Sequence, residues 1–371
     1  MEETKPPALL PRLVALLGLL FLFLVSIKLL ESSIKLMGED AAQDMFLGIA
    51  HPLAGLAAGI LATVLVQSSS VSTSTIVALV GSGTVTVETA VPMIMGANIG
   101  TTITNTLVSL GAIARRSDFR RAFAAATVHD FFNLMAVIVL LPLQIMTGFL
   151  SKAAVAISNQ VSFGGEGDSF KSPLKTAVKT VAGWVQNFLE TVGLSGGWEA
   201  FAMLAIGLGL IFVSLSTITK LMKVVIADRA EKAMNRALKK SGLIAIGIGA
   251  VLTIAVQSSS ITTSLLVPLC SSGILTLENA FPVMLGANIG TTITAFLASL
   301  ATDKHGLEIA LVHMMFNLIA VGLTYPISAL RRIPIRMART LAIVAVRNKM
   351  IVAAYVMVTF ILIPLLLLAV L

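Results

Sequence analysis

VQSSSVSTST at residues 66–75 returns as VQSSSITTSL at residues 256–265, and GANIGTTIT at residues 96–104 returns unchanged at residues 286–294. The distance between the two motifs is the same in both copies, and 24 of the 39 positions that they bound are identical without a gap. Chance does not produce such agreement, so the chain contains an internal repeat. Many membrane transporters are built from two copies and bind their substrate where the copies meet.

The repeat extends beyond these motifs. HDFFN at residues 129–133 corresponds to HMMFN at residues 313–317, and SSIKLM at residues 32–37 resembles TITKLM at residues 217–222. We therefore expect four parts: a first repeat, a linker with an amphipathic helix, a second repeat, and a basic segment followed by a last transmembrane helix. Their boundaries are residues 1–150, 151–199, 200–330 and 331–371.

The composition is that of a membrane protein. Hydrophobic residues make up 57% of the chain, charged residues 12%, and the mean hydropathy is +0.96, whereas soluble domains carry about 25% charged residues. Apolar stretches such as residues 350–371 approach or exceed the roughly 20 residues that a membrane-spanning helix needs. We predict an all-α polytopic membrane protein whose surroundings are a lipid bilayer. The net charge of +8 sits in loops beside apolar stretches, which argues against nucleic-acid binding.

Loop charge predicts how the repeats are oriented. The loop before the HDFFN motif is rich in arginine, whereas its second-copy counterpart carries Lys304 between Asp303 and Glu308. By the positive-inside rule the first loop is cytoplasmic and the second external, so the repeats have inverted topology. The N-terminus, with Lys5, is then cytoplasmic. Residues 31–44 and 151–172 lie outside, and the basic residues of the first loop (Arg115, Arg116, Arg120 and Arg121) and of residues 220–240 and 331–349 lie inside.

The polar motifs need partners, because lipid satisfies neither hydroxyl nor amide groups. Small residues let helices pack closely, and this is the structural alternative for any one such run. Two copies at equal spacing favour a binding site instead. Pro92, Gly96 and Gly100, with Pro282, Gly286 and Gly290 in the second copy, predict broken transmembrane helices. A half-helix N-terminus attracts an anion without a basic side chain, while unwound carbonyls bind a cation.

The paired QSSS and GANIGTT motifs, with FRRAF through HDFFN at residues 119–133, resemble the type II sodium–phosphate cotransporter family. The resemblance implies re-entrant helical hairpins at each QSSS and alternating access between the repeats. It implies sodium-coupled symport of inorganic phosphate into the cell, with sodium as the coupling ion, no organic cofactor and no enzymatic activity. Electrogenic members carry an Ala-x-Ala-x-x-x-Asp pattern, which Ala124, Ala126 and Asp130 match, whereas the second copy has Met314 in place of the aspartate.

The motifs and the resemblance give two sets of expected ligands. Phosphate is assigned to Gln67, Ser68, Ser69, Ser70, Asn98, Gly100, Thr101, Gln257, Ser258, Ser259, Ser260, Asn288, Gly290 and Thr291. Sodium is assigned to Gln67, Ser70, Thr102, Asp130, Gln257, Ser260 and Thr292. His129 and His313 occupy matching positions; we interpret them as buried, hydrogen-bonded side chains outside the ion sites.

Several alternatives stay open. The substrate could be sulfate, arsenate or a carboxylate, and the protein could be a passive channel. An intramembrane serine hydrolase, with His129 or His313 as base, fits poorly because a nucleophile is needed only once. Compactness favours a bacterial inner membrane, and the sequence leaves open whether the chain forms a homodimer.

Overall fold

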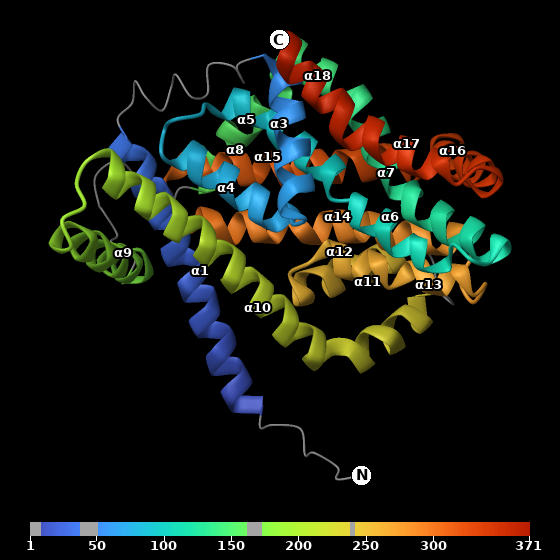
Figure 1. The fold of residues 1–371 in the computed structure, drawn as a ribbon, viewed down its shortest axis with the longest axis horizontal. Coiled ribbons are helices and arrows are strands. Elements are labelled where there is room, and N and C mark those ends of the chain that lie inside the picture. The colour runs from blue at the N-terminus through green and yellow to red at the C-terminus, as the bar shows by residue number, and fades with distance from the viewer. Residues whose placement is uncertain (1–8, 38–50, 162–172, 238–241) are drawn as a thin grey trace.

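The computed structural model describes residues 9–37, 51–161, 173–237 and 242–371, and all regular structure in these ranges is helical (Figure 1). The prediction of an all-α chain is confirmed. The helices of the first copy are α1 (Leu9–Met37), α3 (Pro52–Val66), α4 (Ser69–Gly81), α5 (Val87–Gly100), α6 (Ile103–Ser109), the short η1 (Leu110–Ala112) and α7 (Arg116–Thr147).

Two helices link the copies, α8 (Phe149–Val161) and α9 (Pro173–Thr191). The second copy contains α10 (Gly197–Ala237), α11 (Gly242–Val256), α12 (Ser259–Ser264), α13 (Leu266–Ser271), α14 (Leu277–Ser299) and α15 (Lys304–Thr324). The chain ends with α16 (Ser328–Arg347), α17 (Met350–Met357), the π-helical turn η2 (Val358–Leu362) and α18 (Ile363–Val370).

Six helices in the described part of the chain are long and apolar enough to cross a membrane. They are Pro11–Met37, Arg116–Thr147, Gly197–Met222, Leu277–Ser299, Lys304–Thr324 and Met350–Val370. The polytopic membrane character expected from composition is therefore confirmed. Lys5, residues 38–44, 162–172 and 238–240, which carry some of the topology predictions, lie outside the described residues.

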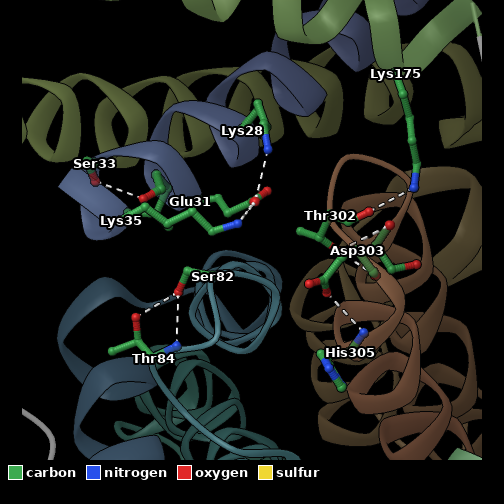
Figure 2. Close-up of polar contacts among 12 residues, drawn as sticks. Lys28, Glu31, Ser33, Lys35, Ser82, Thr84, Lys175, Thr302, Asp303 and His305 are labelled. Carbon is green, nitrogen blue, oxygen red and sulfur yellow. Dashed lines mark hydrogen bonds and ion pairs between the residues drawn. The ribbon is translucent and has the colours of Figure 1, made fainter. Parts of the chain in front are cut away.

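Residues 31–37, expected in an external segment, continue helix α1. Glu31 is 2% exposed there and accepts hydrogen bonds from Lys28 at 2.9 Å and Lys35 at 2.8 Å (Figure 2). These lysines lie one helical turn before and after the carboxylate, so they neutralise it within the same helix. Glu31, the first residue of the segment expected outside, is thus compatible with helix.

The same close helix packing occurs in both copies. Helix α3 packs on α5, and α11 packs on α14. At each contact a Cβ on the glycine would overlap the backbone of the facing helix, so no larger side chain fits without moving a helix. The glycines are Gly59, Gly96 and Gly100 in the first copy and Gly249, Gly286 and Gly290 in the second.

The prediction of a broken helix at GANIGTT is confirmed in the first copy and wrong in the second. Helix α14 runs unbroken from Leu277 through Gly290 to Ser299, and in the first copy only the turn at Thr101 and Thr102 separates α5 from α6. Both asparagines lie inside helices, and a helix N-terminus follows the motif only in the first copy, where α6 begins at Ile103. The motif Gly-x-x-x-Gly provides close helix contact here rather than a break.

The turn that joins α4 to α5 and the turn that joins α13 to α14, called here the first and second hairpin turns, each pack against the other copy. A Cβ on Gly81, at the first hairpin turn, would overlap Thr302, and Figure 2 shows these two turns side by side below α1. Arg121 donates to the Ser271 carbonyl at the second hairpin turn, at 2.8 Å. Lys175 of α9 caps the Thr302 carbonyl at 2.9 Å. Helices α9 and α16 lie at opposite ends of the long axis of the molecule (Figure 1).

Candidate functional site

The Gln-Ser-Ser-Ser motifs form two turns of the same geometry. Gln67 and Gln257 have φ angles of 56° and 55°, in the left-handed region that side-chain-bearing residues rarely adopt. They are the only non-glycine residues in the described chain with positive φ. Strained backbone of this kind persists where the surroundings enforce it, often at functional sites. Its occurrence in both copies marks the motif as the central feature of each.

A new helix starts directly after each strained glutamine. Ser68 is extended, and its hydroxyl accepts the Val71 N–H at 3.3 Å; Ser258 does the same for Ile261. These are N-caps of α4 and of the α12–α13 segment. Ser69 and Ser259 are buried in the first turns, and Ser70 and Ser260 follow them. Both copies therefore have a helix N-terminus at QSSS, whereas only the first copy has one after GANIGTT.

Both glutamine side chains are held within their own copy. The Gln67 amide donates to the Val64 carbonyl at 2.5 Å, and its Oε1 accepts from Thr104 at 3.4 Å. Gln257 makes the equivalent bonds with Ile254 at 2.6 Å and with Thr294 at 3.0 Å. One N–H of each amide is thus engaged, which leaves its second N–H to donate and a lone pair on its oxygen to accept. Each glutamine can therefore contact either phosphate or sodium, and its assignment to both stays a prediction.

The two motifs meet across the repeat boundary. The Ser70 hydroxyl donates to the Gln257 carbonyl at 3.5 Å, and Thr263 of α12 donates to Asn105 of α6 at 3.0 Å. Thr291 donates to the Ser259 hydroxyl at 3.1 Å within the second copy. Hydroxyl groups and helix N-termini from both copies therefore lie close together. An oxyanion site formed between the two copies would need such an arrangement.

The remaining predicted threonines point back into their own helices. Thr101 donates to the Ala97 carbonyl, Thr102 to Ile99 and Thr292 to Ile289, at 2.8, 2.8 and 2.7 Å. A hydroxyl that donates its hydrogen to a carbonyl of its own helix presents only oxygen lone pairs to a ligand. These lone pairs suit sodium, and the assignment of Thr101 to phosphate stays a prediction. Gly100 and Gly290 serve helix packing.

A buried cluster of asparagine and histidine joins the copies. Asn133 donates to the Asn98 carbonyl at 2.7 Å, and Asn288 donates to the Asn133 side chain at 2.7 Å. His129 Nε2 lies 2.5 Å from the Asn288 Oδ1. Asn98 and Asn288 therefore join helices, and neither lies at a helix N-terminus. The interpretation of His129 as a buried, hydrogen-bonded side chain is confirmed.

The second histidine behaves differently. His313 is fully buried, but neither of its ring nitrogens has a hydrogen-bond partner among the described residues. Asn317 donates to the His313 carbonyl at 3.0 Å, and its own Oδ1 also lacks a partner there. The expectation that His313 is hydrogen-bonded is therefore wrong, because the two copies differ in this cluster.

Asp130 is a buried carboxylate with one clear partner. It is 3% exposed, and Tyr355 of α17 donates to its Oδ2 at 2.7 Å. Thr102 lies beside it. Asp130 Oδ1 has no geometrically acceptable partner among the described residues. The sequence places Asp130 and Thr102 in one sodium site, and the structure brings them together.

The described chain contains no group of three or more histidine, cysteine, aspartate or glutamate side chains that could hold a metal ion. A cation site here would therefore use hydroxyl, amide and carbonyl oxygens together with Asp130. Oxygen donors of this kind suit hard cations. The cavities of about 680, 570 and 550 Å³ lie at the arginine-rich end, and no QSSS residue lines them.

Sequence reasoning missed several residues of the site. Thr104 and Thr294 end the duplicated GANIGTTIT motif, and Asn133 belongs to the duplicated HDFFN motif, so the repeat itself was the signal that could have found them. Tyr355 lies beyond both repeats, and nothing in the sequence linked it to Asp130.

Comparison with known proteins agrees with this geometry. The sequence model of the family described as "Na+/Pi-cotransporter" matches residues 22–163 and 210–346, which include both QSSS motifs. Sodium-dependent phosphate transport protein 2B of Homo sapiens is 35% identical over 444 residues, covering 95% of this chain and 64% of the relative. Sodium-dependent phosphate transport protein 2A of Rattus norvegicus is 36% identical over 420 residues, covering 94% of this chain and 66% of the relative.

The chain thus spans just under two thirds of the length of these relatives. No solved structure matches it. The family model covers both copies of the repeat and both strained turns, and the chain therefore belongs to the Na+/Pi-cotransporter family.

Proposed function

We propose that this protein carries inorganic phosphate into the cell together with sodium, by alternating access of the site between its two copies. One observation carries the proposal: the two strained Gln-Ser-Ser-Ser turns meet, with the Ser70 hydroxyl donating to the Gln257 carbonyl. The related proteins named for sodium-dependent phosphate transport support the choice of substrate and coupling ion.

The chemistry of the site explains why sodium is required. Serine, threonine, glutamine and asparagine supply the hydrogen bonds around the two turns, and no lysine or arginine takes part in them. The first N–H groups of α4 and α12 and the serine hydroxyls can donate to phosphate. They supply only partial positive charge, so a divalent anion needs accompanying cations to enter a low-dielectric site. Sodium bound to the acceptor oxygens nearby would supply that charge.

Inverted orientation of the two copies is supported by the positions of their loops. Helix α14 has 23 residues, which makes it about 34 Å long, enough to cross a bilayer core of roughly 30 Å. Arg121 contacts the turn before this helix, and Thr302 follows its end and contacts the first copy's hairpin turn at Gly81. The arginine loop and the Asp303 loop would then face opposite sides of the membrane, with the arginines and the N-terminus in the cytoplasm.

Re-entrant hairpins are supported by helix length. Helices α3 and α11 have 15 residues each, or about 22 Å, which is too short to cross the bilayer core. Each stops at its strained glutamine, and the chain continues as a second short helix. Backbone that unwinds at this depth is tolerated where protein or water satisfies it, as at a transport site.

Asp130 is the candidate ligand of an additional sodium ion that makes transport electrogenic. Its Oδ1 has no hydrogen-bond partner among the described residues, while Tyr355 donates to Oδ2 and Thr102 offers an acceptor oxygen beside it. Buried intramembrane carboxylates usually mark ion pathways. Tyr355 would position the carboxylate, because it fixes one oxygen and leaves the other toward the site.

Other oxyanions and a serine hydrolase are less well supported. No hydrogen bond in the described chain joins His129 or His313 to a serine of either QSSS motif, as general-base catalysis would require. Arsenate copies the charge and shape of phosphate, so we expect it to compete. Sulfate differs in being unable to donate a proton at neutral pH.

Uptake of radiolabelled phosphate into proteoliposomes tests the proposal. An inward sodium gradient should drive accumulation, and choline in place of sodium should abolish it; equal uptake in choline would contradict coupling. Ser70→Leu and Ser259→Leu should each lose uptake while remaining folded. Ser272→Leu, at the exposed hairpin turn, is the matched control and should transport normally. Stronger competition by sulfate than by arsenate would reassign the substrate.

A further inference from the structure

Helix α16 presents three different faces. Its buried face, which packs along α7, consists of Pro334, Ile335, Ala338, Ala342 and Ala345. Arg332, Arg336 and Arg339 share a second face, and the exposed apolar residues Ile333, Met337 and Val344 share a third, about 100° further round the helix. A helix with exposed apolar and basic faces side by side is typical of the membrane interface, where one faces acyl chains and the other headgroups.

The arginine face borders a cavity of about 570 Å³. Four arginines contribute to its lining, together with a single carboxylate, Glu278, which pairs with Arg339 at 2.6 Å. Arg331 stacks over the ring of Tyr325, with its guanidinium carbon 5.1 Å from the ring centre. Arg331, Arg332 and Arg336 form no ion pair with a described acidic residue. The cavity therefore has a clear excess of positive charge.

Two helix N-termini add to that charge. Helix α11 begins at Gly242 and α14 at Leu277, and Gly242, Glu278 and Asn279 all line the cavity. The positive ends of both helix dipoles thus lie at the arginine cluster. Gly242 also admits the Tyr325 hydroxyl, which any Cβ at that position would overlap. The wall of the cavity is therefore built by close packing as well as by surface charge.

We propose that this cavity binds the phosphate group of an anionic phospholipid headgroup, from the bilayer leaflet on the side of the arginine cluster. Planar guanidinium groups match phosphate oxygens with paired hydrogen bonds, which a lysine cluster would not. The exposed Ile333, Met337 and Val344 beside the arginines favour a lipid over a free ion, because acyl chains can cover them while the headgroup enters the cavity. Tyr325 has the amphipathic character common at this depth.

The bound lipid would join the two halves of the molecule. Helix α16 packs on α7 of the first copy, whereas the opposite wall of the cavity comes from α11, α14 and the end of α15 in the second. The first copy has Pro52 at the position of Gly242 and no arginine-rich helix after its own His motif. The site therefore belongs to one side of the membrane only, and it is independent of the proposed transport function.

Association of spin-labelled lipid with the full chain, reconstituted in phosphatidylcholine membranes, tests the proposal. Spin-labelled phosphatidylglycerol should associate more strongly than spin-labelled phosphatidylcholine. The double variant Arg332→Gln/Arg336→Gln removes charge-assisted hydrogen bonds to the phosphate group and should reduce that preference by roughly tenfold for each arginine. The double variant Arg347→Gln/Lys349→Gln removes the same charge from the same region outside the cavity, and it should leave the preference within about twofold of the unchanged chain.

Each other outcome overturns the proposal. If both double variants lose the preference for phosphatidylglycerol equally, that preference comes from general surface charge. If the Arg332→Gln/Arg336→Gln variant keeps the preference, the cavity is not the binding site. If millimolar inorganic phosphate displaces the labelled phosphatidylglycerol, the site belongs to a free anion rather than to a lipid. Unchanged association of phosphatidylcholine with every variant shows that the variants remain folded, so the comparison stays interpretable.

Discussion

Gly286→Ala tests whether the GANIG segments pack helices or interrupt them. A Cβ at Gly286 would overlap the Ile246 carbonyl and the Ala250 backbone nitrogen of α11. Both neighbours are backbone, so no side chain can rotate away and the two helices must separate. Overpacking of this kind costs about 1–3 kcal/mol, and the absence of a flexible neighbour places the cost near the upper end. The repeat counterpart, Gly96→Ala, meets the Leu56 carbonyl and should behave alike.

Gly247→Ala in α11 is the matched control, because nothing lies within 4 Å of the added Cβ. Each variant gains about 1 kcal/mol of helix propensity, and this gain cancels when the two are compared. Unfolding in mixed micelles should therefore place Gly286→Ala about 3 kcal/mol below Gly247→Ala. Equal stability, with phosphate uptake lost only in Gly286→Ala, would refute the packing argument and restore the segment as a hinge.

Three further predictions concern the ion sites and the topology. Tyr355→Phe removes a hydrogen bond to a carboxylate, worth about 1.5–3 kcal/mol, so half-maximal sodium for phosphate uptake should rise by roughly tenfold or more; an unchanged sodium dependence would exclude a positioning role. Asp130→Gly should lower the transported charge per phosphate while flux persists, and an unchanged ratio in voltage-clamp recordings would reject the sodium site. In a background where the buried Cys270 is replaced by serine, Arg115→Cys and Asp303→Cys should react with membrane-impermeant maleimide from opposite sides. Labelling from one side would contradict inverted repeats.

The strongest sequence signals were those that occur twice. Duplication identified the QSSS motifs, and the structure gives both the same left-handed glutamine and capping serine. One pattern nevertheless has two physical meanings. Glycine four residues from glycine weakens an isolated helix, but it also lets two helices touch, and only the position of the facing helix decides between these effects. Gly286 faces α11, so packing wins there.

Tyr355 illustrates a different limit. The last helix has no counterpart in either copy, so internal comparison cannot assign a role to any of its residues. Its contact with Asp130 depends on how this helix docks against Phe123 and Phe131, which pack on the tyrosine ring. Such a contact between residues 225 positions apart is a property of tertiary packing, which composition and spacing do not encode locally.

The difference between the two histidine clusters bears on alternating access. In the repeat, His313 corresponds to His129, and Asn98 corresponds to Asn288. The His129–Asn288 pair is hydrogen-bonded, whereas the His313–Asn98 pair is not. A buried polar group without a partner costs about 1–3 kcal/mol. The unpartnered ring nitrogens of His313 therefore destabilise this conformation. If the proposed alternating access exchanges the two halves, the His313–Asn98 pair would form and the His129–Asn288 pair would open. The His–Asn hydrogen bond would then contribute similarly to both conformations, and bound ions could shift the balance between them.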